Sequence, residues 1–130
     1  MIVVDASALV AALDGTGAAG MTARAAVQRS EQHAPHLIDL EVMSAMRSKL
    51  LRGETDVAGV QAVMDDLAAY PLQRHAHVDL LPRVWQLREN VTTYDAVYIA
   101  LTEAIGATLV TADARLARAP GPRCAIELLT

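Results

Sequence analysis

Short β-branched runs, separated by longer helical segments, constrain the fold of this chain more than any other feature. Residues 2–4 (Ile-Val-Val) and 108–111 (Thr-Leu-Val-Thr) lack the alternation of a half-exposed strand. Such runs are typical of strands buried on both faces of a parallel sheet. Because parallel strands need crossover connections, usually helices, the alternation predicts an α/β fold with helices on both faces of a parallel sheet.

The remaining helices and strands are predicted from helix-capping residues, from the helix breakers Gly and Pro, and from the spacing of apolar residues. Helices are expected over residues 5–14, 21–32, 38–51, 56–70, 78–89 and 94–105, with a short helix through Leu116. Three more strands are expected at residues 35–37, 72–76 and 125–129. No repeat, low-complexity tract or linker interrupts this order, so residues 1–130 are expected to form a single domain.

Composition restricts the core and the cellular compartment. The chain is 53% hydrophobic but has one Trp, three Tyr and no Phe, so aliphatic residues must fill the core. Met43, Met46 and Met64 are expected there, and Trp85 and Leu87 are expected to anchor a helix to it. The single cysteine, Cys124, cannot form an internal disulfide, which favours a reducing cytoplasm. No apolar run approaches the ~20 residues that cross a bilayer, and the first residues do not resemble a signal peptide.

The net charge of −4 is unusual for a nucleic-acid-binding protein, because phosphate contacts need Lys and Arg. That objection disappears if the excess acid is gathered in one pocket and neutralised by a metal ion. A basic stretch, residues 47–52, is best interpreted as a solvated helix face.

Four of the fifteen acidic residues stand out by position. Asp5 and Asp113 follow the two clearest strands, so both are expected at the carboxyl edge of the sheet, where parallel α/β folds bind ligands. Glu41 lies inside an apolar helical run, where an unpaired carboxylate is strongly disfavoured. Asp95 lies in the first turn of an otherwise apolar helix. Helix capping offers an alternative explanation for Asp5, Asp95 and Asp113, but not for Glu41.

The motifs around these acids resemble the PIN-domain ribonucleases, specifically the VapC-type toxins of bacterial type II toxin–antitoxin pairs. The matching stretches are Val3-Val4-Asp5-Ala6-Ser7-Ala8-Leu9, Glu41, Trp85-Gln86-Leu87-Arg88, Thr93-Tyr94-Asp95-Ala96-Val97-Tyr98-Ile99-Ala100-Leu101 and Leu109-Val110-Thr111-Ala112-Asp113-Ala114-Arg115-Leu116. They occur in the family's order and span nearly the whole chain. One departure is Ser44, where the family often has Asn.

The resemblance implies a three-layer α/β/α fold with a short parallel sheet of strand order 3-2-1-4-5. It implies a metal-dependent endoribonuclease whose acidic quartet, Asp5, Glu41, Asp95 and Asp113, holds Mg²⁺ or Mn²⁺. Ser7 and Thr111 match hydroxyl positions beside the metal. It further implies an RNA substrate, a small antitoxin partner and a homodimer.

The chemistry of the quartet agrees with this reading. Clustered carboxylates repel one another unless a cation neutralises them, and Mg²⁺ prefers a few carboxylates plus water. Such an ion polarises a phosphodiester and activates water, which would leave a 5′-phosphate and a 3′-hydroxyl. Asp5 and Asp95 are the first choices as direct ligands. Asp113 shares the metal directly or through water, and Glu41 is either a ligand or the base.

Other classes of protein fit less well. A phosphate-receiving signalling domain needs a Lys at a later strand end, but Lys49 lies in a helix; haloacid-type phosphatases need an Asp where Ser7 stands. A catalytically inactive PIN fold that only binds partners is argued against by the intact quartet. No glycine-rich nucleotide motif occurs, and the histidines, His33, His36, His75 and His77, lack the spacing of a zinc site.

Overall fold

The computed structural model describes all 130 residues and contains one five-stranded sheet in which every neighbouring pair is parallel. The strand order is β3-β2-β1-β4-β5, which confirms the expected order. The strands are β1 (Ile2–Val4), β2 (Gln32–Pro35), β3 (Leu72–His75), β4 (Thr108–Thr111) and β5 (Ile126–Leu128). The first strand along the chain is therefore the middle strand of the sheet, with β4 directly beside it.

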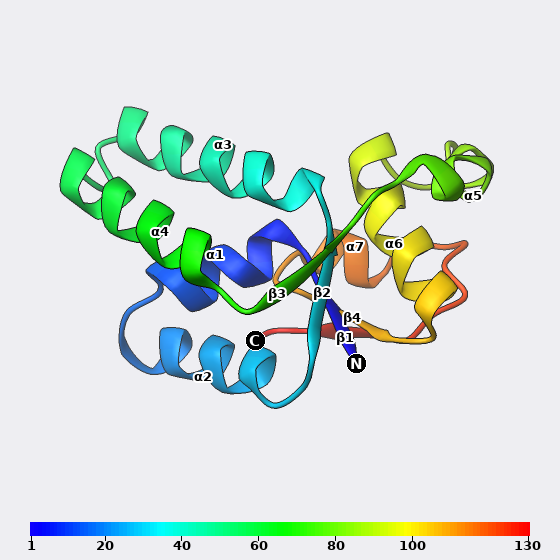
Figure 1. Ribbon diagram of the computed structural model, residues 1–130, viewed down its shortest axis with the longest axis horizontal. Helices are drawn as coiled ribbons and strands as arrows, with labels where there is room; N and C mark the ends of the chain where they lie inside the picture. The colour runs from blue at the N-terminus through cyan, green and yellow to red at the C-terminus, as the bar shows by residue number, and fades with distance from the viewer.

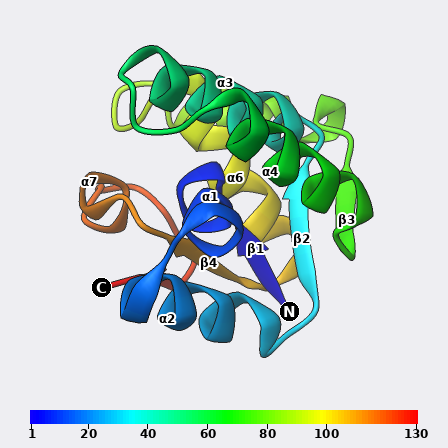
Figure 2. The same cartoon turned by 90° about the vertical axis from the view of Figure 1, so that its left-hand side faces the viewer.

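Helices cover both faces of this sheet, as the alternation of elements predicts. They are α1 (Ala6–Asp14), α2 (Gly17–Gln28), α3 (Leu37–Leu51), α4 (Val57–Ala69), the 3₁₀ turn η1 (Val78–Leu80), α5 (Leu81–Gln86), α6 (Thr93–Ile105) and α7 (Ala114–Ala117). Figures 1 and 2 show α1 to α4 on one side of the sheet and α5 and α6 on the other. The helix α6 packs directly against β1, β2 and β4.

The core is centred on the two inner strands and α6. Val3, Val4, Leu109 and Val110 are fully buried, which agrees with their continuous apolar runs. Along α6 every residue from 96 to 102 is buried, so this helix lies in the interior. Its ends are set by Thr92, whose hydroxyl accepts from the Asp95 N–H at 3.1 Å, and by Gly106, whose φ of 68° is left-handed.

Some core assignments from the sequence are confirmed and others are wrong. Met46 and Leu87 are fully buried, and Met64 is partly buried against the core. Met43 is instead half exposed on α3. Trp85 is 67% exposed, and the Arg88 guanidinium lies 4.7 Å from its ring, so Trp85 makes a surface cation–π contact.

The second helix and second strand lie earlier in the chain than expected. The helix α2 begins at Gly17 rather than Met21, and Gly20 in its first turns packs closely on Gly15 at the end of α1. A Cβ at Gly20 would lie only 2.3 Å from the Gly15 carbonyl oxygen, so this contact needs glycine. The strand β2 covers Gln32–Pro35 instead of residues 35–37, and its polar residues Gln32 and His33 are buried between β1 and β3.

The segment expected as one helix over residues 78–89 is divided. It forms η1 and then α5, and Pro82 lies in the first turn of α5. The Leu87 N–H bonds back to both Arg83 and Val84, which tightens the last turn and ends the helix. None of the helices combines the length and apolar character that a bilayer crossing requires.

Candidate active site

Two strand ends bring Asp5 and Asp113 to the same edge of the sheet. Asp5 directly follows β1 and caps α1, while Asp113 follows β4 by two residues and caps α7. Val4 and Val110 are paired neighbours, and the Asp5 N–H continues the ladder by donating to the Val110 carbonyl at 3.1 Å. Both acids are helix caps, as the alternative explanation states, but the sheet also brings them together.

The carboxylate of Asp5 is only 6% exposed and is held by hydrogen bonds from three groups. Its Oδ1 accepts from the Ser7 hydroxyl at 2.6 Å and from the Ala8 N–H at 2.9 Å, and its Oδ2 accepts from the Thr111 hydroxyl. The Thr111 oxygen also accepts from the Asp113 N–H at 3.0 Å. Ser7 and Thr111 therefore lie beside Asp5 and fix the direction of its carboxylate.

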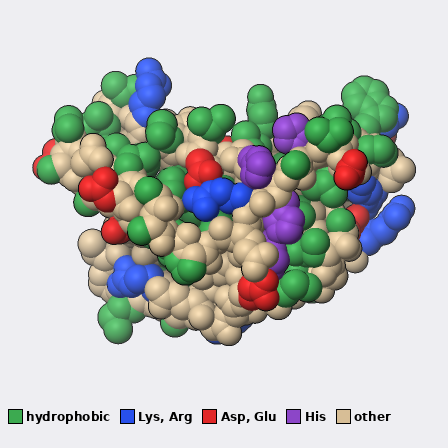
Figure 3. Space-filling model, in the orientation of Figure 1, with side chains coloured by type: hydrophobic (Ala, Val, Ile, Leu, Met, Phe, Trp, Pro, Cys, Tyr) green, Lys and Arg blue, Asp and Glu red, His purple; other side chains and the backbone are tan.

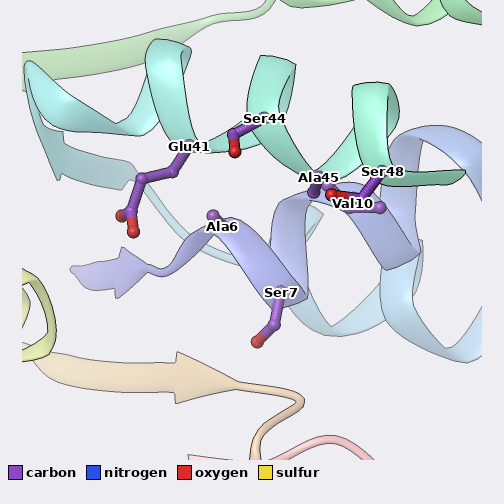
Figure 4. Close-up of a pocket in the computed structure, with 7 residues that line it drawn as sticks. All are labelled: Ala6, Ser7, Val10, Glu41, Ser44, Ala45 and Ser48. Carbon is purple, nitrogen blue, oxygen red and sulfur yellow. The ribbon is translucent and has the colours of Figure 1, made fainter. Parts of the chain in front are cut away.

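Glu41 and Asp95 reach the same place from two different helices. Asp95 lies in the first turn of α6, whose N-terminus faces this edge of the sheet. Glu41 lies in the second turn of α3, and in Figure 4 its carboxylate projects toward the start of α1. No local sequence signal links Glu41 to the other acids, which are 36 residues or more away along the chain; the packing of α3 on α1 makes the connection.

The acidic quartet lines a single cavity of about 170 Å³. The complete lining is Asp5, Ala6, Ser7, Glu41, Asp95, Tyr98 and Asp113. All four acids singled out in the sequence are therefore brought together, and no other acidic residue lines this cavity.

The cavity disfavours negative charge. Burial raises the pKa of Asp5, although hydrogen bonds from Ser7 and Thr111 oppose that shift. Burial likewise raises the pKa values of Glu41 and Asp95. Repulsion adds to each shift: Asp95 acts on Asp5 and on Glu41, and Asp113 acts on Asp95. A cation among these carboxylates would remove this penalty.

Tyr98 is a cavity residue to which the sequence assigned no role. It follows Asp95 by three residues and therefore lies on the same side of α6. Its hydroxyl and Oε1 of Glu41 are both buried without a hydrogen-bond partner of normal geometry. The two groups are nevertheless close, since the Tyr98 hydroxyl lowers the pKa of Glu41 against the larger effect of burial. The signal for Tyr98 was its place in the Tyr-Asp-Ala-x-Tyr motif.

These donors suit a hard divalent cation that keeps part of its water shell. The cavity offers oxygen donors only, including the unpartnered Oε1 of Glu41. No group of three or more Asp, Glu, His or Cys side chains is placed so that it could hold a metal ion by itself. An ion bound by these carboxylates would therefore have to keep several waters, as Mg²⁺ does.

The histidines lie away from the cavity. His33 and His75, on neighbouring strands, share a hydrogen bond of 2.8 Å between Nδ1 and Nε2, and His33 Nε2 lies 3.1 Å from Glu31. Figure 3 shows histidine side chains gathered on the face that carries β2 and β3. None of them lines the acidic cavity.

Comparison with known proteins identifies similar chains. The family described as PIN domain matches residues 2–122. Ribonuclease VapC1 of Mycobacterium tuberculosis is 44% identical over 128 residues, which cover 98% of this chain and 96% of that protein. Ribonuclease VapC3 of the same species is 40% identical over 118 residues, covering 91% and 86%. The crystal structure of M. tuberculosis VapC20, a Sarcin-Ricin loop cleaving toxin, superposes with a TM-score of 0.68 at 16% identity, covering 90% and 93%.

Proposed function

Because this chain belongs to the PIN-domain family and resembles VapC ribonucleases along nearly its whole length, we propose that its acidic cavity is the active site of a toxin endoribonuclease. One observation carries the proposal: four carboxylates from separate parts of the chain line one cavity at the carboxyl edge of a parallel sheet. The substrate is RNA, and the reaction is hydrolysis of a phosphodiester bond. Residues 1–130 act as a single domain in this proposal.

The ion that the quartet holds is Mg²⁺, with Mn²⁺ as a substitute. Asp5 and Asp95 are its direct ligands, and Asp113 and Glu41 hold it directly or through water. The bound ion supplies Lewis acidity toward the phosphate and lowers the pKa of a coordinated water. The raised pKa values of three carboxylates and the oxygen-only lining support this choice.

The side chains of this protein orient the reaction. The hydroxyls of Ser7 and Thr111 fix the Asp5 carboxylate at the wall of the cavity. Glu41 has two alternative roles: it is a ligand of the ion, or it accepts the proton of the attacking water. The water oxygen bonds to phosphorus while the bond to the 3′ oxygen breaks. The products are a 5′-phosphate and a 3′-hydroxyl.

Removal of divalent metal is the first test of this function. The purified protein is expected to cut single-stranded RNA with Mg²⁺ or Mn²⁺ and to lose activity in EDTA, because metal-free carboxylates repel the phosphate. Added Mg²⁺ should restore cleavage, and mass analysis of the fragments should show 5′-phosphate ends. Undiminished cleavage in EDTA, or products with cyclic phosphate ends, would contradict the metal mechanism.

The proposed partner is a small antitoxin that blocks the cavity. A pocket lined by four carboxylates attracts cations, and the planar fork of an Arg meets two carboxylates at once. A basic side chain of the antitoxin therefore occupies the cation position and excludes RNA. The enzyme and its inhibitor act in the cytoplasm, which agrees with the single unpaired cysteine.

The toxin is proposed to form a homodimer through an apolar hollow of about 320 Å³, lined by side chains that include Leu40, Leu81 and Tyr94. These three side chains are about half exposed or more in the monomer, as a contact surface requires. Light scattering is expected to give twice the chain mass of 13.8 kDa. Leu40→Asp should shift the protein toward monomer, because a charge would be buried in the contact.

A matched control is Val57→Asp, which places the same charge at an exposed position of α4 outside the hollow. It should leave the mass unchanged. A monomeric wild type, or a Leu40→Asp protein of unchanged mass, would contradict the proposed dimer.

A further inference from the structure

The acidic cavity is the middle of a longer groove. On one side it shares Ala6, Ser7 and Glu41 with a hollow of about 380 Å³ between α1 and α3. On the other side it shares Asp95 and Asp113 with a hollow of about 180 Å³ beside α7. Figure 4 shows the first hollow, with the small side chains of Ser44, Ala45 and Ser48 along α3. An extended ligand bound in the cavity would therefore have space on both sides of the cavity.

This groove is almost free of positive charge. The lining of the three hollows includes four carboxylates but only one Lys or Arg, which is Arg115 beside α7. Other arginines are engaged elsewhere: Arg83 pairs with Glu103, Arg74 with Asp39, and Arg29 with Glu127. A polyanion that enters the groove meets repulsion everywhere except at Arg115 and at a bound metal ion.

The Arg115 side chain is available for a ligand. It is 91% exposed, and its Nε forms only a loose ion pair with Asp113 Oδ1 at 3.7 Å, a distance too long for a hydrogen bond. The Asp113 carboxylate instead accepts from the Arg115 backbone N–H at 2.8 Å. The guanidinium thus stands at the rim of the cavity with its donors unused by the protein.

We propose that Arg115 is a substrate-positioning residue that binds the phosphate next to the scissile phosphodiester, at the α7 end of the groove. This inference rests on the proposed function of the cavity. The two donors of a guanidinium fork match two phosphate oxygens, so a bound phosphate is fixed in direction as well as in position. The scissile phosphate is then held over the quartet, and the neighbouring nucleotide on the other side lies in the hollow of Ser44 and Ser48.

The test compares Arg115→Gln with Arg118→Gln. Arg118 is the C-cap of the same short helix, is exposed, and lines none of the three hollows. Arg115→Gln is expected to raise KM for a single-stranded RNA about tenfold with kcat changed less than about twofold, because ground-state and transition-state binding are lost together. The slope of log affinity against log salt should become shallower by about 0.7, as for one lost phosphate contact on a single strand. Arg115→Lys should keep the salt slope and recover part of the affinity, and Arg118→Gln should resemble wild type.

A second measurement separates this role from an indirect effect on the metal. Removing a positive charge near Asp113 and Asp95 tightens Mg²⁺ binding, so a lower Mg²⁺ requirement with unchanged KM for RNA would overturn the inference. Binding of the same fluorescent RNA oligonucleotide to the Asp5→Asn, Asp95→Asn variant, with and without Arg115→Gln, decides the point by anisotropy without catalysis, because the two Asn side chains relieve the repulsion of the carboxylates. Equal affinity of these two proteins overturns the inference, whereas a wild type that cuts no RNA with Mg²⁺ or Mn²⁺ overturns the proposed function instead.

Discussion

Replacing Asp5 and Asp95 together by Asn is expected to lower RNA cleavage by more than about 100-fold, because loss of groups that only support a metal ligand already costs about 10–100-fold. The Asn side chains keep the shape of the site but remove two of its charges. At Asp5, an Asn can still accept from the Ala8 N–H, and its amide can donate to the Thr111 hydroxyl in place of the present bond. The fold should therefore survive, with less repulsion in the metal-free protein.

Activity, Mg²⁺ affinity and thermal unfolding of the double variant should be measured side by side. Asp79→Asn is the matched control, since Asp79 is an exposed acid in η1 outside the cavity. It should change none of the three quantities. If Asp5→Asn alone unfolded the metal-free protein, Asp5 would be principally a structural cap of α1.

The same double variant tests the antitoxin contact. A partner whose basic side chain occupies the cavity should bind the variant more weakly than wild type, and its affinity for wild type should fall as salt is raised. Equal affinity for the variant and the wild type would place inhibition outside the cavity.

Stability of the metal-free protein should depend on pH in a direction set by the quartet. Asp5, Glu41 and Asp95 have pKa values raised above their ordinary values of 3.8, 4.5 and 3.8. In this range the folded chain binds more protons than the unfolded chain, so these groups make the free energy of unfolding fall as pH rises. Their stabilising effect is complete below the ordinary pKa values and is lost as pH passes through the raised ones.

The measurement is the free energy of unfolding from urea titrations between pH 4 and 7.5 in EDTA and in Mg²⁺. The difference between wild type and the Asp5→Asn, Asp95→Asn variant isolates Asp5 and Asp95, because Glu54 and Glu103, whose pKa values are lowered, act in the opposite direction in both proteins. In EDTA, wild type should lose stability relative to the variant as pH rises. Mg²⁺ should reduce that loss, since the ion binds the ionised carboxylates. A pH-independent difference in EDTA would contradict the repulsion argued for the cavity.

The sequence predicts the structure best where the local residue pattern of a segment agrees with its place in the assembled sheet. The strand β1 is a continuous apolar run and β4 has an apolar centre, as expected for buried strands, and the Asp after each strand follows from the carboxyl-edge rule. The strand β2 was misplaced because Gln32 and His33 do not look like buried residues; His33 satisfies one ring nitrogen through His75, which lies far along the chain. Such a partner becomes visible only once the sheet is assembled.

Roles that depend on packing between distant elements were harder to predict. Glu41 stands out in the sequence because it interrupts an apolar run, and the packing of α3 on α1 brings it to the cavity. Tyr98 was visible only as part of a motif, since a buried tyrosine in an apolar helix is usually core. The apolar character of Met43 and Trp85 predicts core positions, yet Met43 is half exposed and Trp85 is largely exposed, because helix periodicity does not show which partner a face will meet.

The pairing of β1 with β4 determines when the sheet and the site can be completed during synthesis of the protein. Residues 2–4 pair with residues 32–33 on one side and with residues 108–110 on the other, and the second pairing must wait until residue 110 has been made. Asp113 and the Thr111 hydroxyl that holds Asp5 arrive only with this late segment. A nascent chain that ends before it has neither a complete sheet nor a complete site, whatever helices have already formed. The nuclease site therefore cannot be complete until residue 113 has been synthesised, which delays the point at which a toxin can damage the RNA of the cell that makes it.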